Sequence, residues 1–130
     1  MPEGFNFEIV KSRKRTLEIH VEGCPPWKQI PANGGERTRQ KERRALLEQR
    51  AKEIFGKAPC LVTQIALSIR YRRNKGRADA CNIIGGVADA LEVLYIDDRE
   101  IKEVHYTEQM GAKDEYWVTV EGQFFDERSG

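Results

Sequence analysis

The fold class of this chain is decided by one stretch, CLVTQIALSIRYRR, at residues 60–73. Every second residue in this stretch falls on one side of an extended chain. These residues are apolar or β-branched over nine positions: Leu61, Thr63, Ile65, Leu67 and Ile69. A period of two predicts a β-strand with one buried face. The strand runs into a basic strip, because five Lys or Arg residues occupy positions 70–77.

Outward from this strand, the flanking segments alternate between helix and strand patterns. Two helices are expected at 36–55 and about 80–92, and three more strands at 16–23, 100–108 and 115–125. The segment QMGAKD between the last two strands contains a glycine and predicts a hairpin loop. The order strand, helix, strand, helix, strand, strand predicts an α+β domain, a small mixed β-sheet with helices packed on one face.

The chain has 130 residues, a length typical of a single domain, so one domain is predicted. We expect a basic and flexible arm at 1–16, the domain at 17–125 and a short polar tail at 126–130. No apolar run of about 18 residues is present, so no membrane span is expected. The N-terminus does not resemble a signal peptide. Three widely spaced cysteines without a CxxC pair favour reduced thiols, so a cytoplasmic location is predicted.

The charges are divided unequally between the two parts of the chain. Residues 1–77 hold 18 Lys and Arg against 8 Asp and Glu, whereas residues 78–130 hold 4 against 13. Seven of the basic residues surround the apolar face of the first helix: Arg37, Arg39, Lys41, Arg43, Arg44, Arg50 and Lys52. Such asymmetry favours contact with nucleic acid. The alternative is that the two parts neutralise each other in the fold.

Polar side chains share one side of the second predicted helix. At 100° per residue, Asp79, Asn82, Gly86 and Asp89 fall in the sector opposite the apolar face. Asp79 also suits the N-cap position of this helix. Two adjacent glycines, Gly85 and Gly86, cost about 1 kcal/mol each in a helix interior. Either another element or a ligand is therefore expected to approach the helix closely there.

A second carboxylate pair, Asp97 and Asp98, precedes the next strand. Taken alone it is typical of a polar turn. Together with Asp79 and Asp89 it predicts a carboxylate pocket, which a divalent cation would hold together. Mg²⁺ bound by carboxylates supports phosphodiester hydrolysis, and the basic strip would bind the flanking phosphates without reading sequence.

Several segments together resemble the RusA family of Holliday junction resolvases. These are the basic strand end, RADACN opening a helix, ADAL near the end of that helix, and DDREI before a strand. The segment VEGCPPWKQ, with two prolines and a lysine after the first strand, is also similar to the opening of the family. The resemblance covers roughly residues 17–121.

The resemblance implies a small RusA-like homodimer that binds branched DNA, cuts four-way junctions and uses Mg²⁺ or Mn²⁺. Many members are encoded by phages or prophages, and no small-molecule cofactor is expected. The implied catalytic residues are Asp79, Asn82, Asp89, Asp97 and Asp98, of which Asp79, Asp89 and Asp98 would hold the metal. The expected DNA-binding residues are Lys28, Arg70, Arg72, Arg73, Lys75 and Arg77.

Two positions depart from the family pattern. Cys81 stands where the second aspartate of the motif belongs, and thiol sulfur is a poor ligand for Mg²⁺. Gly85 stands where members have a functional lysine. We expect Asp89 to complete the metal shell, and Arg77 or Lys75 to replace the missing cation.

Three functions stay open on the sequence alone. The first is a metal-dependent junction endonuclease. The second is a catalytically weakened or inactive RusA-like module that binds branched DNA without cutting it. The third is a domain that binds no nucleic acid and whose charges are solvated surface.

Overall fold

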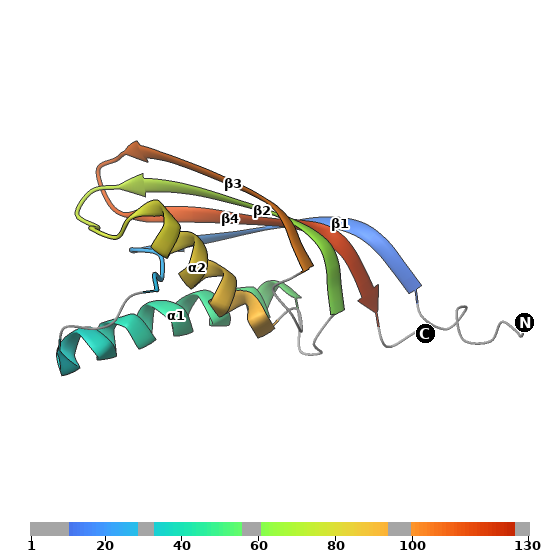
Figure 1. The fold of residues 1–130 in the computed structure, drawn as a ribbon, viewed down its shortest axis with the longest axis horizontal. Coiled ribbons are helices and arrows are strands. Elements are labelled where there is room, and N and C mark those ends of the chain that lie inside the picture. Colours follow the sequence, from blue (N-terminus) through green and yellow to red (C-terminus); the bar gives the residue numbers. More distant parts are fainter. Residues whose placement is uncertain (1–10, 29–32, 56–60, 94–99, 127–130) are drawn as a thin grey trace, which may run out of the picture.

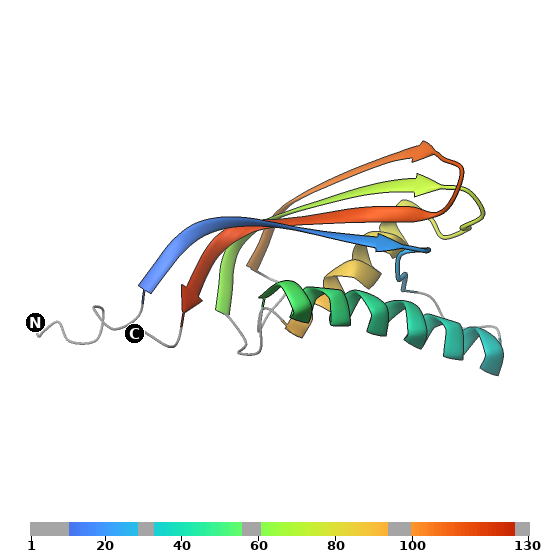
Figure 2. The same ribbon diagram turned by 180° about the vertical axis from the view of Figure 1, so that it is seen from behind.

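Both helices lie on one face of a four-stranded sheet, as Figures 1 and 2 show from opposite sides. The computed structural model describes residues 11–28, 33–55, 61–93 and 100–126. The elements are the strands β1 (Lys11–Glu22), β2 (Leu61–Arg73), β3 (Ile101–Met110) and β4 (Glu115–Asp126), the helices α1 (Gly34–Phe55) and α2 (Ala80–Ala90), and the short 3-10 helix η2 (Leu91–Val93). The predicted α+β class, the element order and the one-sided helix layer are confirmed.

The sheet is mixed, with the strand order β1-β4-β2-β3. β2 and β3 are parallel, and β4 runs antiparallel to its neighbours β1 and β2. The expectation that the last two strands form a hairpin is wrong, because β2 lies between them. The connection at 111–114 instead passes the end of β2, where the Gly111 N–H donates to the Arg73 carbonyl oxygen over 3.0 Å.

Helix α2 is the crossover that a parallel strand pair requires. It leaves the end of β2 and leads back to the start of β3, so it runs opposite to both strands (Figure 1). Its N-terminus therefore lies beside the ends of β2 and β3, and its C-terminus beside their starts. This direction decides which sequence-predicted site residues can meet.

Strand β1 begins earlier than expected. Residues 11–16, placed in the flexible arm 1–16, are part of β1 and pair in register with Glu121–Asp126 of β4. The run KSRKR shows no apolar alternation, but backbone hydrogen bonds to β4 do not depend on side-chain polarity. Asp126, assigned to the tail, is the last residue of β4. Residues 1–10 and 127–130 lie outside the described residues.

A β-bulge interrupts β2 near Gln64. The pairing with β4 shifts between Thr63 and Ala66, and Gln64 has a φ of 55°, in the left-handed region. Bulges bend a strand and increase its twist. In Figure 1 the beginning of β2 curves toward the helix layer, as do the end of β4 beside it and the beginning of β1 at the sheet edge.

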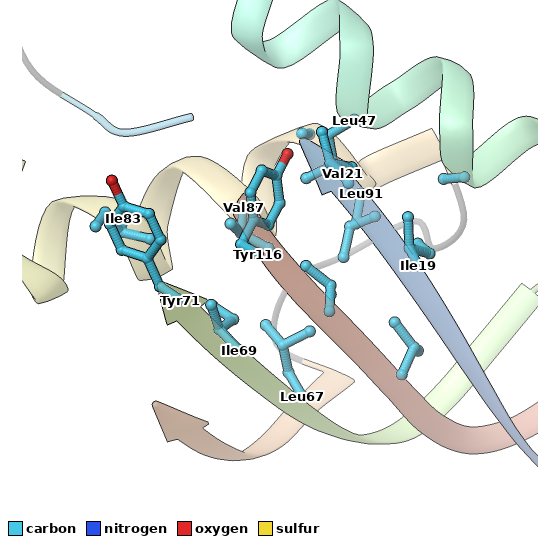
Figure 3. Close-up of a cluster of buried hydrophobic side chains, with 14 of the residues drawn as sticks. Ile19, Val21, Leu47, Leu67, Ile69, Tyr71, Ile83, Val87, Leu91 and Tyr116 are labelled. Atoms are coloured by element: carbon cyan, nitrogen blue, oxygen red, sulfur yellow. The ribbon is translucent and has the colours of Figure 1, made fainter. Parts of the chain in front are cut away.

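The core lies between the helices and the facing side of the sheet, and Figure 3 shows part of it. The sheet contributes alternate residues of three strands, and α2 contributes its apolar face. Side chains with at most 1 % exposure include Ile19, Leu47, Leu67, Ile69, Tyr71, Ile83, Val87, Leu91, Tyr116 and Val118. The predicted apolar face of α2 is confirmed by Ile83, Val87, Ala90 and Leu91, all of which are buried.

Each helix begins at a polar cap. Asn33 accepts a hydrogen bond from the Glu36 N–H at its Oδ1 atom over 2.9 Å, so α1 starts at Gly34 rather than at the predicted Glu36. Asp79 accepts one from the Asn82 N–H over 2.8 Å and caps α2. Within the described ranges, no helix is long and apolar enough to cross a membrane.

Candidate functional site

The segment Pro25–Lys28 lies directly on the face of α2 that was predicted to carry polar residues. Pro25 and Pro26 are buried, and so is Gly86. A Cβ atom on Gly86 would lie 2.5 Å from the carbonyl carbon and oxygen of Pro26 and from the Cα of Trp27. Of the two explanations for the glycine pair, close backbone packing is therefore the one observed at Gly86.

Lys28 brings an ammonium group to this face of α2. Its backbone N–H donates to the Asn82 carbonyl oxygen over 2.9 Å, which fixes the segment against the helix. Its side chain crosses Gly85, where a Cβ atom would lie 2.9 Å from the Lys28 Cδ. The Nζ atom then lies 3.3 Å from Asp89 Oδ2. A cation thus occupies the surface above Gly85, supplied by another segment.

Asp79 and Asp89 are both on α2, but the structure does not bring them together. Ten positions on a helix correspond to about 15 Å along its axis. Mg²⁺ contacts its oxygen ligands at about 2.1 Å, so one ion cannot contact both carboxylates. Asp89 is partly buried and pairs with Lys28, whereas Asp79 is exposed at the N-terminus of α2. The expectation that Asp89 completes the metal shell around Asp79 is not supported by this geometry.

The predicted pair Asp97 and Asp98 lies outside the described residues. The described residues on either side of it are Val93, the last residue of η2, and Glu100, immediately before β3. The Glu100 carboxylate accepts a hydrogen bond from the Gln64 N–H over 3.4 Å, beside the bulge of β2. Both flanking residues therefore belong to the end of the molecule where α2 terminates.

Asp79 belongs to the opposite end of the molecule. The carbonyl oxygen of its neighbour Ala78 accepts a hydrogen bond from the Arg73 guanidinium over 2.7 Å, at the last residue of β2. The stretch of β2 from Gln64 to Arg73 extends about 30 Å at the usual rise of a strand. The length of the crossover thus separates Asp79 from Glu100 within one chain.

The basic strip at 70–77 does not form a single patch. Arg70 and Arg72 project from the sheet face opposite the helices, where their guanidinium groups lie 4.5 and 5.2 Å from the centre of the Trp117 ring. The His20 ring stacks on Trp117 at 4.7 Å. Because Asp79 belongs to the helix layer, these two arginines point away from its side of the sheet.

Arg73 is used inside the chain. Its guanidinium binds the Glu108 carboxylate of β3 with contacts of 2.7 and 2.9 Å. It also donates to the carbonyl oxygens of Gly76 and Ala78. The Glu108 hydrogen bond raises the pKa of Arg73 above its ordinary value. Arg73 therefore anchors the loop that precedes Asp79, rather than standing free for a ligand.

A single carboxylate organises the same loop from the other side. Asp114 accepts hydrogen bonds from the Tyr71 hydroxyl over 2.6 Å and from the N–H groups of Asn74, Lys75 and Gly76 over 2.9, 2.9 and 3.2 Å. Partial burial alone would raise the pKa of Asp114, but these four donors outweigh it and lower the pKa to about 2. The sequence offered no signal for this role, because the donors are about forty positions away in the chain.

Lys75 and Arg77 remain exposed on the loop that Arg73 and Asp114 hold. No ion pair or side-chain hydrogen bond involves their charged groups within the described ranges. They are also the two predicted cations nearest to Asp79 in the chain. Of the expected DNA-binding residues, these two and Lys28 therefore belong to the helix layer and its loops.

A cleft lies between α1, the Pro26–Lys28 segment and α2. It has a volume of about 370 Å³, with Trp27 and the Gly86 backbone among its lining. Four of its lining side chains are cationic: Lys28, Arg37, Lys41 and Arg44. The sequence revealed the basic character of α1, but which of its cations share one cleft depends on how α1 packs against α2.

The described residues do not complete a metal site on their own. No group of three or more His, Cys, Asp or Glu side chains is arranged to hold an ion within the part of the chain that the structure describes. Cys81, at the departing motif position, is exposed. No protein-family model and no curated protein matches this sequence.

Proposed function

We propose that this protein is a metal-dependent, structure-selective DNA endonuclease of the Holliday junction resolvase type. One observation carries the proposal. Asp79 presents an exposed carboxylate from a helix N-cap, directly after a loop that exposes Lys75 and Arg77. Such a pairing of a rigid carboxylate with adjacent cations suits cleavage of a phosphodiester, in which one group binds the metal and others bind phosphates.

Different residues anchor the loop, bind phosphates and bind the metal. Asp114 and Arg73 hold the backbone of the loop, so that Lys75 and Arg77 bind DNA phosphates at a constant distance from Asp79. The Asp79 Oδ1 atom accepts the cap hydrogen bond, and Oδ2 fits as a ligand for a hard cation. When bound, Mg²⁺ or Mn²⁺ would polarise the scissile phosphoryl group.

The second carboxylate of each ion is proposed to come from a partner chain. In one chain, Asp79 and the residues that flank Asp97 and Asp98 lie at opposite ends of α2. A two-fold dimer can place one end of α2 beside the other end of the partner's α2, since an isologous contact exchanges the two surfaces. Asp79 of one chain and Asp98 of the other would then complete two equivalent sites.

The experiment that tests the catalytic assignment is Asp79→Asn. Asparagine caps helices about as well as aspartate, so the fold and the loop are expected to persist. We expect junction binding to remain and cleavage in millimolar Mg²⁺ to fall by at least about 100-fold, which is about 2.7 kcal/mol in activation free energy. Asp89→Asn is the comparison on the same helix, and we expect unchanged Mg²⁺ affinity because Asp89 pairs with Lys28 and lies about 15 Å from Asp79 along the helix axis. Full cleavage by Asp79→Asn would reject the proposal.

Mixing two inactive variants tests whether the site spans two chains. A heterodimer of Asp79→Asn and Asp98→Asn would contain one intact composite site and one doubly altered site. We therefore expect the mixture to regain nicking of one junction strand, although each variant alone is inactive. If each site were formed within one chain, the heterodimer would contain no intact site and the mixture would stay inactive.

A second candidate function is a RusA-like module that binds branched DNA without cutting it. The exposed Cys81 at a motif position that otherwise carries aspartate favours this alternative. A nicking assay on a synthetic four-way junction, with both Mg²⁺ and Mn²⁺, separates the two. Tight, salt-dependent binding without nicking under either ion would favour the module.

A further inference from the structure

The cleft between α1 and α2 collects positive charge from two separate elements. Arg37, Lys41 and Arg44 are exposed on α1 at spacings of four and three, which place them on one side of the helix. Lys28 faces the same cleft from the Pro26–Lys28 segment. The four cations surround a volume of about 370 Å³, whose lining includes one carboxylate, Asp89.

The charge of this cleft is not neutralised within the described chain. Asp89 already pairs with Lys28 at 3.3 Å, and Arg44 is 3.5 Å from Glu48. The charged groups of Arg37 and Lys41 have no ion-pair partner among the described residues. The cleft therefore retains a surplus of about two positive charges that a ligand could neutralise.

The walls of the cleft are held rigidly. Arg43, on the neighbouring side of α1, places its guanidinium 3.6 Å from the centre of the Trp27 ring and also binds Glu36 over 2.9 Å. Arg44 donates to the Asp89 carbonyl oxygen of α2 over 3.3 Å. These contacts tie α1 to both other walls, so the cations are presented in a preformed arrangement.

We propose that this cleft binds the sugar-phosphate backbone of a DNA arm, as a second phosphate track separate from Lys75 and Arg77. From Arg37 to Arg44 the row extends about 10 Å along α1. One DNA strand carries a negative charge about every 3.4 Å of helix axis, so a row of this length is long enough to contact more than one phosphate of a strand. The inference rests on the proposed function, because it takes DNA as the ligand, but it requires no cleavage.

Lys41→Gln tests the proposal against the matched control Lys52→Gln. Both lysines are exposed on α1 and lose the same charge, but only Lys41 lines the cleft. Binding of a four-way junction is measured with EDTA at several salt concentrations. The slope of log affinity against log salt is negative, and losing one phosphate contact makes it less steep by about 0.9. If the contact contributes nothing at 1 M salt, the variant should bind about 15-fold more weakly than the wild type at 50 mM salt and about 4-fold more weakly at 200 mM.

We expect these changes for Lys41→Gln and for the second variant Arg37→Gln, and an unchanged slope for Lys52→Gln. Equal slopes for Lys41→Gln and Lys52→Gln would overturn the proposal, even if the wild-type protein cuts junctions. If Lys41→Gln and Arg37→Gln reduce the salt dependence and Lys52→Gln does not, but the wild-type protein does not cut the junction, the phosphate track is supported and the proposed nuclease activity is rejected. Polyglutamate that competes as well as DNA, with the same sensitivity to Lys41→Gln, would assign the cleft to an acidic protein segment instead.

Discussion

Replacing each of the two glycines of α2 with alanine should change stability in opposite directions. Alanine is preferred over glycine in a helix interior by about 1 kcal/mol, and this gain applies to both positions. At Gly86 the new Cβ atom would lie 2.5 Å from three backbone atoms of Pro26 and Trp27. Carbon atoms normally pack at about 3.5–4.0 Å, so the Pro25–Lys28 segment would have to move by about 1 Å.

The two variants should therefore differ by about 2–3 kcal/mol in free energy of unfolding. Overpacking of this kind costs roughly 1–3 kcal/mol, and rigid backbone atoms favour the upper end, so Gly86→Ala should lose about 2 kcal/mol net. At Gly85 the nearest atom is Cδ of Lys28, at 2.9 Å, on a flexible side chain that can turn away. Gly85→Ala should therefore be neutral or more stable by up to about 1 kcal/mol.

Urea unfolding followed by tryptophan fluorescence measures both variants directly, because Trp27 lies in the segment that must move. The free energies are compared at an unchanged denaturant slope, which shows that the compactness of the folded state is retained. If Gly86→Ala proves as stable as Gly85→Ala, the contact between the proline segment and α2 is not the reason for the glycine pair.

Three further predictions concern the loop and the core. The pKa of Asp114 is lowered from 3.8 to about 2, so its carboxylate stabilises the fold above pH about 4 and this contribution is lost as the pH falls toward 2. Asp114→Asn should cost about 2 kcal/mol at pH 7 and little at pH 2 in urea unfolding, and an equal cost at both pH values would contradict this. Arg73→Gln should cost about 2 kcal/mol in the same assay, because charged hydrogen bonds to the loop and to β3 are lost. Arg72 is exposed, and Arg72→Gln should change stability by less than about 1 kcal/mol. Tyr116→Phe should be neutral or stabilising, because the buried hydroxyl of Tyr116 has no hydrogen-bond partner within the described ranges. Tyr71→Phe should cost about 1–3 kcal/mol, because the hydroxyl of Tyr71 donates to Asp114. A higher melting temperature for Tyr71→Phe than for Tyr116→Phe would refute this.

The sequence predicted the secondary structure well because local patterns decide it. Alternation from Ile65 to Ile69 and the helical spacing of Ile83 and Val87 are set by the geometry of one element, and burial confirms both. The first part of β1, residues 11–15, was not predicted as strand, since its pairing with β4 depends on a segment more than one hundred positions away. The hairpin prediction failed for a related reason, because strand order is a property of the whole sheet.

The residues of the candidate site were chosen from sequence, but their grouping was not. Asp79 was correctly expected as a possible N-cap, which only requires the start of a helix. The basic strip was expected to act together, yet Arg70 and Arg73 project from different faces and Arg73 is committed to Glu108. A strand sends neighbouring side chains to opposite sides, so closeness in sequence does not give closeness on the surface.

The helices and strands, their order, and the cations and carboxylates available to a site follow from the amino-acid sequence, because they depend on local periodicity and composition. The packing of distant segments places Lys28 over Gly85, Asp114 against the loop before Asp79, and the cations of α1 in one cleft with Lys28. The fold also places Asp79 and Glu100 at opposite ends of the molecule, because α2 connects the end of β2 to the start of β3. Each of these facts depends on how distant segments pack, and packing is set by the whole chain at once.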